Sequence, residues 1–112
     1  MKKIFLIVLL LIVGCSSVKI THSIKLEGLH TGWYENGQKK EEITYKNGKR
    51  NGKWTLWYEN GQKKLEGTYK YGEEDGLWIW WYENGQKMSE VTWKDGEEIS
   101  KKEWNRDGSV RE

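Results

Sequence analysis

Residues that could catalyse a reaction or hold a metal ion are few in this sequence. His22 and His30 are the two histidines, and neither has a cysteine or glutamate at the spacing that a zinc site needs. No serine lies in the Gly-x-Ser-x-Gly motif of a hydrolase. The acidic segments 73–75 and 95–98 lack the spacing of a dedicated calcium loop. The sequence therefore predicts a protein that is not an enzyme and that uses no metal or cofactor.

Cys15 is the residue whose surroundings indicate a covalent modification. The basic residues Lys2 and Lys3 are followed by an unbroken apolar segment, 4–13, and the small residue Gly14 stands directly before the cysteine. A basic start, a short apolar segment and a small residue at the cleavage point are typical of a secretory signal peptide. A helix needs about 20 apolar residues to cross a bilayer. The segment is therefore predicted to be a signal peptide and not a transmembrane helix.

The segment Ile12-Val13-Gly14-Cys15 is similar to the lipobox of bacterial lipoproteins. The resemblance implies that residues 1–14 are removed as a lipoprotein signal peptide and that Cys15 becomes the lipidated first residue of the mature chain. Several acyl chains on one residue would hold the protein firmly in a membrane of the cell envelope. The alternative is an unmodified cysteine that closes an ordinary signal sequence.

The composition of the chain argues against a nucleic-acid partner. The sequence has 19 Lys and Arg residues against 17 Asp and Glu, and removal of Lys2 and Lys3 leaves 17 of each. Nucleic-acid binding relies on an excess of basic side chains that face phosphates.

Eight Trp, six Tyr and no Pro favour β-strands, because aromatic residues fit a pleated sheet and proline interrupts its hydrogen bonds.

One short segment, Trp-Tyr-Glu-Asn-Gly-Gln-Lys, occurs three times and organises the rest of the chain. The copies start at Trp33, Trp57 and Trp81 and are therefore evenly spaced. Each contains an Asn-Gly pair, which favours a two-residue type I′ turn because both central positions of that turn need a positive φ. Each copy is therefore predicted to be a β-hairpin. A fixed period of this length is typical of a repeat array.

A second turn is marked in each repeat by glycines that recur with the same period as the Trp-Tyr-Glu-Asn-Gly-Gln-Lys copies. The segments 47–52 and 72–76 each contain two of these glycines and are expected to form a longer connection. The predicted fold is all-β: an antiparallel β-meander of repeated hairpins in a single twisted sheet. Its central strands are expected at Lys53–Glu59, Gln62–Lys70, Leu77–Glu83 and Gln86–Lys94.

The segment from Gly52 to Gly72 resembles the bacterial variant of the MORN repeat. It reads Gly-x-Trp-x-x-Trp-Tyr-Glu-Asn-Gly-Gln-Lys-Lys-x-Glu-Gly-x-Tyr-Lys-x-Gly, and the resemblance extends from Gly28 to about Gly108. Proteins of this kind are often described as YwqK-type antitoxin components of toxin–antitoxin modules. The resemblance implies a MORN-like array over residues 28–112. It does not imply a reaction, because the family is defined by its repeat.

The two ends of the array are expected to depart from the repeat. Apolar and polar residues alternate from 18 to 27 outside the register of the repeat, which predicts a short capping strand within the lipidated N-terminal segment 15–27. At the other end, residues 104–108 resemble the start of the Trp81 copy but begin one position too early for the period. We expect an irregular last repeat whose charged side chains discourage edge-to-edge association.

Alternation along the strands divides the tryptophans between two faces of the sheet. One face is expected to form either the core or a binding surface, with Trp54, Trp78 and Trp80, and Trp54 is expected to cover Gly67 across the hairpin. The opposite face carries a row that serves either packing or binding: Trp33, Trp57 and Trp81. Large exposed apolar patches usually mark interaction sites. All six tryptophans are therefore candidate binding residues.

These features predict a membrane-anchored, non-catalytic binding or scaffold lipoprotein of the bacterial cell envelope. Its expected partner is a protein, and the resemblance implies that this partner could be a toxin that the chain neutralises as an antitoxin or immunity-type protein. The alternative is a general envelope lipoprotein whose aromatic sheet face binds a glycan or a lipid surface.

Overall fold

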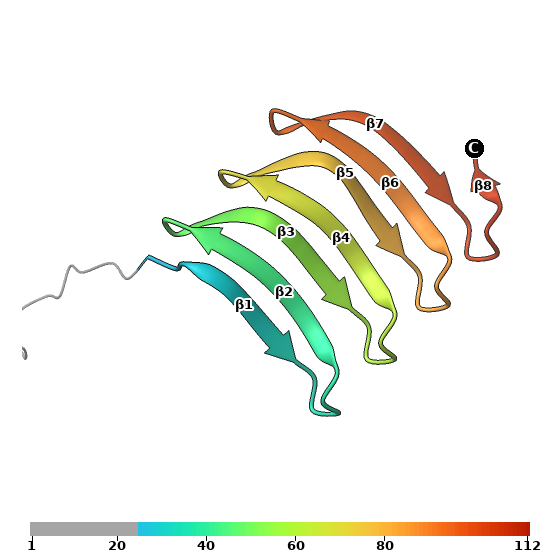
Figure 1. Ribbon diagram of the computed structural model, residues 1–112. Coiled ribbons are helices and arrows are strands. Elements are labelled where there is room, and N and C mark those ends of the chain that lie inside the picture. Colours follow the sequence, from blue (N-terminus) through green and yellow to red (C-terminus); the bar gives the residue numbers. More distant parts are fainter. Residues whose placement is uncertain (1–24) are drawn as a thin grey trace, which may run out of the picture.

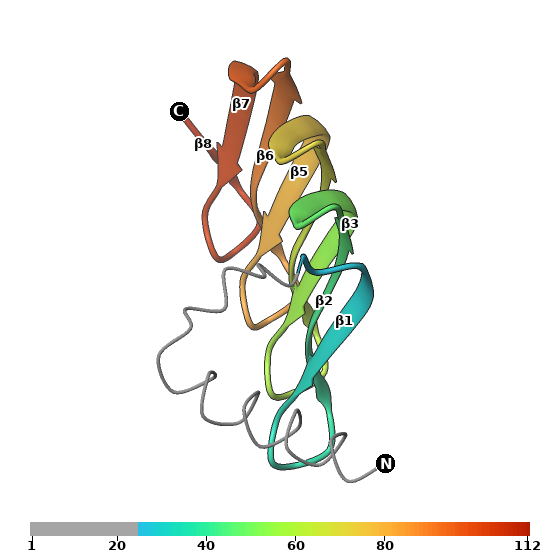
Figure 2. The ribbon, with the colours of Figure 1, turned by 90° about the vertical axis from the view of Figure 1, so that its left-hand side faces the viewer.

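The computed structural model describes residues 25–112, which form one eight-stranded sheet. The strands lie side by side in chain order, and each is antiparallel to the next (Figure 1), as the view turned by 90° also shows (Figure 2). The predicted all-β antiparallel meander is therefore confirmed. The strands are β1 Gly28–Trp33, β2 Lys39–Lys46, β3 Lys49–Trp57, β4 Lys63–Lys70, β5 Glu73–Trp81, β6 Lys87–Lys94, β7 Glu97–Trp104 and β8 Val110–Arg111.

The turn inside each Trp-Tyr-Glu-Asn-Gly-Gln-Lys copy has three residues and not two. Between β3 and β4, Gly61 has a φ of 87°, whereas Asn60 does not adopt a positive φ. The Gly61 N–H donates to the Tyr58 carbonyl at 3.0 Å, and the Tyr58 N–H donates to the Gln62 carbonyl at 2.8 Å. This is a type I turn followed by a glycine bulge, so the predicted type I′ turn was wrong. The Asn60 Oδ1 accepts the Gln62 N–H at 2.9 Å, which favours the observed turn.

The additional turn residue shifts the strand pairing close to the turn. Trp57 pairs with Lys63, where a two-residue turn would have paired it with Lys64. Lys64 is the extra residue, and its Nζ lies 5.5 Å from the centre of the Tyr58 ring. Farther from the turn the pairing agrees with the prediction: Leu56 with Leu65 and Trp54 with Gly67.

Type I′ turns are present at the other end of the strands. Both residues have a positive φ at Asn47-Gly48 (52° and 80°), Tyr71-Gly72 (50° and 86°) and Asp95-Gly96 (52° and 78°). A longer connection was expected here because Gly52 and Gly76 resemble loop glycines. They lie instead inside β3 and β5, where φ values of 113° and 74° accompany a shift of register. These glycines are therefore bulges that bend the strands.

The positions of the turns explain the differences from the predicted strand bounds. β3 begins at Lys49 and not Lys53, and β5 begins at Glu73 and not Leu77, because the tight turn comes earlier than expected. Both strands end at a tryptophan, two residues before the predicted ends, because Tyr-Glu-Asn-Gly forms the turn. β4 and β6 agree with the prediction to within one residue.

The core lies on one face of the sheet. Its buried members are Ile43, Leu65, Tyr69 and Trp78, against which Tyr45, Trp54, Leu56, Trp80 and Trp93 pack. Trp78 exposes 3% of its surface although the sheet is a single layer. The rings of Tyr69 on β4 and Trp54 on β3 cover it: their centres lie 4.9 Å and 5.8 Å from that of the Trp78 ring. Edge-to-face contacts of this kind contribute beyond the area they bury.

Gly67 on β4 provides the space for this ring. A Cβ atom at Gly67 would lie within 2.7 Å of the Cε3 atom of Trp78. The ring that covers the glycine thus comes from β5, although Trp54 of β3 was expected in this role and does pair with Gly67. The Trp78 Nε1 donates to the Thr68 carbonyl at 3.1 Å, which fixes the ring over the glycine.

The residues before β1 contact the first type I′ turn. Lys25, Leu26 and Glu27 lie outside any strand, and the Leu26 carbonyl accepts the Gly48 N–H at 2.9 Å. The signal peptide predicted for residues 1–14, the lipidation site Cys15, His22 and the greater part of the predicted capping strand lie outside the described residues.

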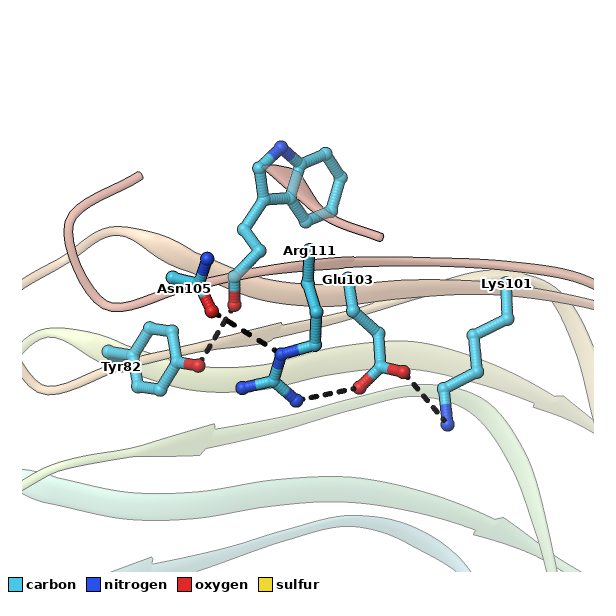
Figure 3. Close-up of polar contacts among 6 residues, drawn as sticks. Tyr82, Lys101, Glu103, Asn105 and Arg111 are labelled. Carbon is cyan, nitrogen blue, oxygen red and sulfur yellow. Dashed lines mark hydrogen bonds and ion pairs between the residues drawn. The ribbon is translucent and has the colours of Figure 1, made fainter. Parts of the chain in front are cut away.

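Charged side chains replace core aromatic residues at the C-terminal end. Through the pairing with β6, Lys101 stands in the cross-strand row of Trp78, and Glu103 in the row of Trp80. Glu103 forms ion pairs with Lys101 at 3.8 Å and with Arg111 of β8 at 3.5 Å (Figure 3). The aromatic core thus ends in a polar network that water can reach.

Candidate binding surface

Hydrogen bonds between the Trp-Tyr-Glu-Asn-Gly-Gln-Lys copies connect each repeat to the next. The Tyr hydroxyl of one copy donates to the Trp carbonyl one repeat on: Tyr34 to Trp57 at 2.6 Å, Tyr58 to Trp81 at 2.7 Å and Tyr82 to Trp104 at 2.9 Å. The Asn Nδ2 of each copy donates to a backbone carbonyl one repeat on: Asn36 to that of Glu59 at 3.0 Å, Asn60 to that of Glu83 at 3.1 Å and Asn84 to that of Arg106 at 2.9 Å. The Tyr and Asn of the motif are therefore occupied in holding the array together.

The Tyr58 hydroxyl must stay protonated to donate its hydrogen bond. Burial of the phenol, assisted by the negative charge of Glu83, raises the pKa of Tyr58 above its ordinary value of 10.0, although Arg106 opposes the shift. The folded chain therefore favours the neutral phenol. The bond between the second and third turns is present throughout the neutral pH range.

The tryptophan row consists of the residues that end β1, β3, β5 and β7, which are Trp33, Trp57, Trp81 and Trp104. Alternation along the strands places these rings on the face opposite the core. Trp33 is 59% exposed, and the other three are half-buried. Because equivalent strands lie two strand spacings apart, the rings recur roughly every 10 Å. Trp104 was not among the predicted candidates, although the likeness of its segment to the Trp81 copy indicated it.

Lysine side chains lie over two rings of the tryptophan row. The Lys39 Nζ is 5.8 Å from the Trp57 ring centre, and the Lys87 Nζ is 5.5 Å from that of Trp104. These contacts combine cation–π attraction with shielding of the ring from water. Both lysines also form ion pairs with carboxylates of the same strand, Lys39 with Glu42 at 2.8 Å and Lys87 with Glu90 at 2.6 Å. The equivalent lysine of β4, Lys63, pairs with Glu66 at 2.6 Å.

Glu66 illustrates the charge balance of this face. It pairs with Lys63 and, at 3.2 Å, with Lys53 of the neighbouring strand. The hydrogen bond from Lys63 lowers the pKa of Glu66, and partial burial opposes this effect. Glu66 is therefore ionised at neutral pH. The row presents aromatic rings among matched charges and not a surface of one sign.

Shallow depressions open to solvent lie beside rings of the tryptophan row. One of about 380 Å³ is lined by Trp81, Gln86, Lys87 and Trp104 together with two turn glycines. A second adjoins Trp81, Gln62 and Lys63. Each combines an aromatic wall with an amide and an ammonium group, which suits a ligand that offers both apolar surface and hydrogen-bond acceptors.

The candidates on the opposite face, Trp54, Trp78 and Trp80, belong to the core or pack against it. The Trp54 Nε1 donates to Glu41 Oε1 at 2.8 Å, and the Arg50 guanidinium lies 5.4 Å from the Trp54 ring centre. A hydrogen bond with the Tyr45 hydroxyl raises the pKa of Arg50, against the effect of burial. These tryptophans are engaged by their own neighbours, unlike the exposed Trp33.

Within residues 25–112, no group of three or more His, Cys, Asp or Glu side chains could hold a metal ion. His30 packs edge-on against the Tyr45 ring, with centres 5.2 Å apart. No helix in this part of the chain is long and apolar enough to cross a membrane.

Comparison with protein families matches the MORN repeat variant at residues 26–47, 50–71 and 74–95. Each match spans one pair of strands and the three-residue turn between them, starting with β1 and β2. No curated protein and no solved structure matches the chain significantly. MORN repeats are typically non-catalytic modules and indicate a binding or scaffold role. Because the three matches cover more than half of the sequence and coincide with the repeated hairpins, this chain belongs to the MORN repeat variant family.

Proposed function

We propose that this protein is a membrane-anchored, non-catalytic binding or scaffold lipoprotein, and that it holds a partner protein against the tryptophan row. The observation that carries the proposal is the row itself, which hydrogen-bonded turns present at regular intervals. Binding energy at protein interfaces concentrates in a few residues, Trp prominent among them. A reaction needs different groups that converge on one point, whereas a row of equivalent rings offers repeated contacts to an extended partner.

The location in the bacterial cell envelope is proposed from the segment Met1 to Cys15, which resembles a lipoprotein signal and its lipidated cysteine. Only the short segment 16–27 separates Cys15 from the start of β1, so the sheet would lie close to the membrane. Cys15→Ser should leave an uncleaved or soluble precursor to which radiolabelled fatty acid is no longer attached. Labelling that persists in this variant would place the anchor elsewhere.

A toxin is the partner that the resemblance to YwqK-type antitoxins suggests. An envelope-tethered protein is suited to neutralise a toxin that is met outside the cytoplasm. A toxin encoded beside this gene should therefore inhibit growth when expressed alone, and co-expression of this protein should restore growth. Binding of other envelope proteins without protection against such a toxin would leave the general scaffold role and reject the antitoxin role.

Replacement of Trp57 and Trp81 by Ala tests the proposed binding surface. We expect the affinity for the partner recovered from envelope extract to fall at least tenfold, which is ~1.4 kcal/mol. Loss of folding should be small because both rings are half-buried. The matched control replaces Leu77 and Ile99, which are 51% and 59% exposed and lie toward the type I′ turns.

Two outcomes would contradict this assignment. A Trp57→Ala, Trp81→Ala variant that unfolds would show that the rings serve packing. A folded variant that retains every partner would move the interaction surface to the core face or to a strand edge.

A glycan is the second candidate ligand, and the depression between Trp81 and Trp104 favours it. Sugar rings stack on aromatic side chains, and their hydroxyls need the hydrogen-bonding groups that Gln86 and Lys87 provide between Trp81 and Trp104. Soluble envelope glycan should then quench tryptophan fluorescence in the wild type and less in Trp81→Ala. Equal quenching in both proteins would reject this site, and sedimentation with lipid vesicles alone would favour a lipid surface.

A further inference from the structure

The type I′ turns form a second surface, with an uneven distribution of charge. We name it the turn edge; it comprises residues 46–50, 70–75 and 94–98, which lie at the same end of the sheet (Figure 1). The first turn has three basic residues, Lys46, Lys49 and Arg50, and one carboxylate reaches it from outside the turn: Glu27 Oε1 accepts the Asn47 N–H at 2.7 Å. The other two each have one lysine and three carboxylates: Lys70 with Glu73, Glu74 and Asp75, and Lys94 with Asp95, Glu97 and Glu98.

The charges of the turn edge are not neutralised by one another. The ion pairs among residues 25–112 join side chains of the strand faces and of the C-terminal end, and none includes a residue of the turn edge. Lys46 and Lys49 are both exposed and stand directly opposite each other across the first turn. Like charges at this spacing repel, so a partner with carboxylates would relieve an unfavourable contact.

The acidic part of the turn edge is hollowed and has an aromatic wall. Tyr71, at the tip of the second turn, is 64% exposed. A depression of about 200 Å³ lies beside it, lined by Lys70, Tyr71, Glu73, Glu74, Asp75 and Asp95. Four carboxylates and an aromatic ring favour a cationic side chain, by charge and by cation–π attraction. The basic first turn of the same chain offers side chains of this kind.

We propose that two copies of this chain associate through the turn edge, with Lys46 and Lys49 of each copy seated in the Tyr71 depression of the other. A two-fold axis makes this contact twice, as in most homodimers. The complementarity requires the two turn edges to run antiparallel, because a parallel alignment would place basic turns opposite each other. Electrostatic complementarity of this kind sets partner and orientation. The tryptophan row, at the opposite end of the strands, is not covered.

A pair of charge-reversed variants tests the proposal on the purified mature protein. The first variant carries Lys46→Glu and Lys49→Glu, and the second carries Glu73→Lys and Asp75→Lys. Sedimentation should show a dimer for the wild type and a monomer for each variant alone, because like charges then meet in both contacts. An equimolar mixture of the two variants should form a dimer again. In the mixed dimer one contact has both charges reversed, and the other joins the unaltered first turn of the second variant to the unaltered second turn of the first variant. The control for the altered net charge of the first variant is Lys40→Glu with Lys64→Glu, which lies beside the three-residue turns and should remain dimeric.

Salt gives an independent measurement. Association of the wild type should weaken at least tenfold between low salt and about 0.5 M salt, where charges are screened within a few ångströms. The proposal is overturned if the wild type is monomeric at low salt, if its dimer survives both reversals, or if two folded variants stay monomeric when mixed. These results leave the proposed role of the tryptophan row untouched, because its test measures partner binding and not self-association.

Discussion

Gly67 is the residue at which the core has the least room. Its ideal Cβ would approach the Trp78 ring to a distance that real side chains do not adopt, and both residues are buried. We expect Gly67→Ala to cost about 1–3 kcal/mol, because Trp78 must leave its contacts with Tyr69 and Trp54. Urea unfolding monitored by tryptophan fluorescence measures this cost.

Gly32→Ala is the matched control for this prediction. A Cβ at Gly32 would meet only the Glu41 Cβ, at 3.8 Å, and the residue has no positive φ. Its change in unfolding free energy should stay within about 0.5 kcal/mol. If Gly67→Ala were equally harmless, the Trp78 ring would have a second position of similar energy.

The Tyr58 hydroxyl is expected to contribute to stability through the bond that it donates to the Trp81 carbonyl. Tyr58→Phe keeps the ring, removes the donor and should cost about 0.5–1.5 kcal/mol. Tyr71→Phe alters an exposed phenol and should have no effect. Thermal unfolding of the two variants compares these costs, and equal melting temperatures would show that water replaces the bond.

Alkaline pH gives a second measurement of the same group. Because the pKa of Tyr58 is raised in the folded chain, the unfolded chain loses this proton first. The stabilisation is complete below the unfolded pKa, near 10.0, and is lost as pH rises from there through the folded pKa. The difference in stability between the wild type and Tyr58→Phe should therefore shrink above that pH. A constant difference would contradict the assigned burial of the phenol.

The two turn types of each repeat make different demands on their residues. The three-residue turn needs a positive φ at its glycine alone, whereas the type I′ turn needs one at both residues. Tyr71 stands at the first position of a type I′ turn with a φ of 50°, where Asn47 stands in the preceding turn with 52°. A left-handed conformation costs a bulky residue more than it costs asparagine.

Tyr71→Asn should consequently stabilise the folded monomer, by about 0.5–1.5 kcal/mol. Urea unfolding at a protein concentration too low for association measures this gain. The same variant should weaken the proposed dimer, because the aromatic wall of the depression is lost. A Tyr71→Asn monomer less stable than the wild type would show that the exposed ring contributes contacts that outweigh its backbone strain.

At the scale of the molecule, residues 28–111 form an array in which each described strand pairs only with its neighbours in the sequence. Stability is then close to a sum of repeat and nearest-neighbour contributions. The buried hydrophobic residues lie on β2, β4, β5 and β6 and on the turn after β5, so the middle of the array contains most of the apolar burial.

Native-state hydrogen exchange should therefore show the strongest protection in β3 to β6 and the weakest in β1, β7 and β8. Strand β7 is mainly exposed, and near its end Glu103 forms ion pairs that water can reach. We therefore expect β7 to open first. Uniform protection across all strands would instead show that the array unfolds as one cooperative unit.

Local patterns in the sequence are sufficient to predict the architecture of this protein. The constant repeat period and the alternation of apolar and polar residues predicted the antiparallel meander, the pairing of Trp54 with Gly67 and the division of the tryptophans between two faces. These features follow from local geometry, because side chains along a strand alternate and short turns join neighbours. The predicted lipidation of Cys15 lies outside the described residues and stays a prediction.

An Asn-Gly pair by itself, in contrast, does not specify which turn it forms. Asn60 and Asn47 both precede a glycine, yet Asn47 alone adopts a positive φ. The Asn60 side chain instead accepts from the Gln62 N–H and donates to the Glu83 carbonyl of the next repeat. Only the stacked array supplies that second partner, and the same stacking brings Trp78 over Gly67 and aligns the charges of the turn edge. The second bond of Asn60 and the position of the Trp78 ring depend on contacts between different strands and repeats, which a local pattern of residue types does not encode.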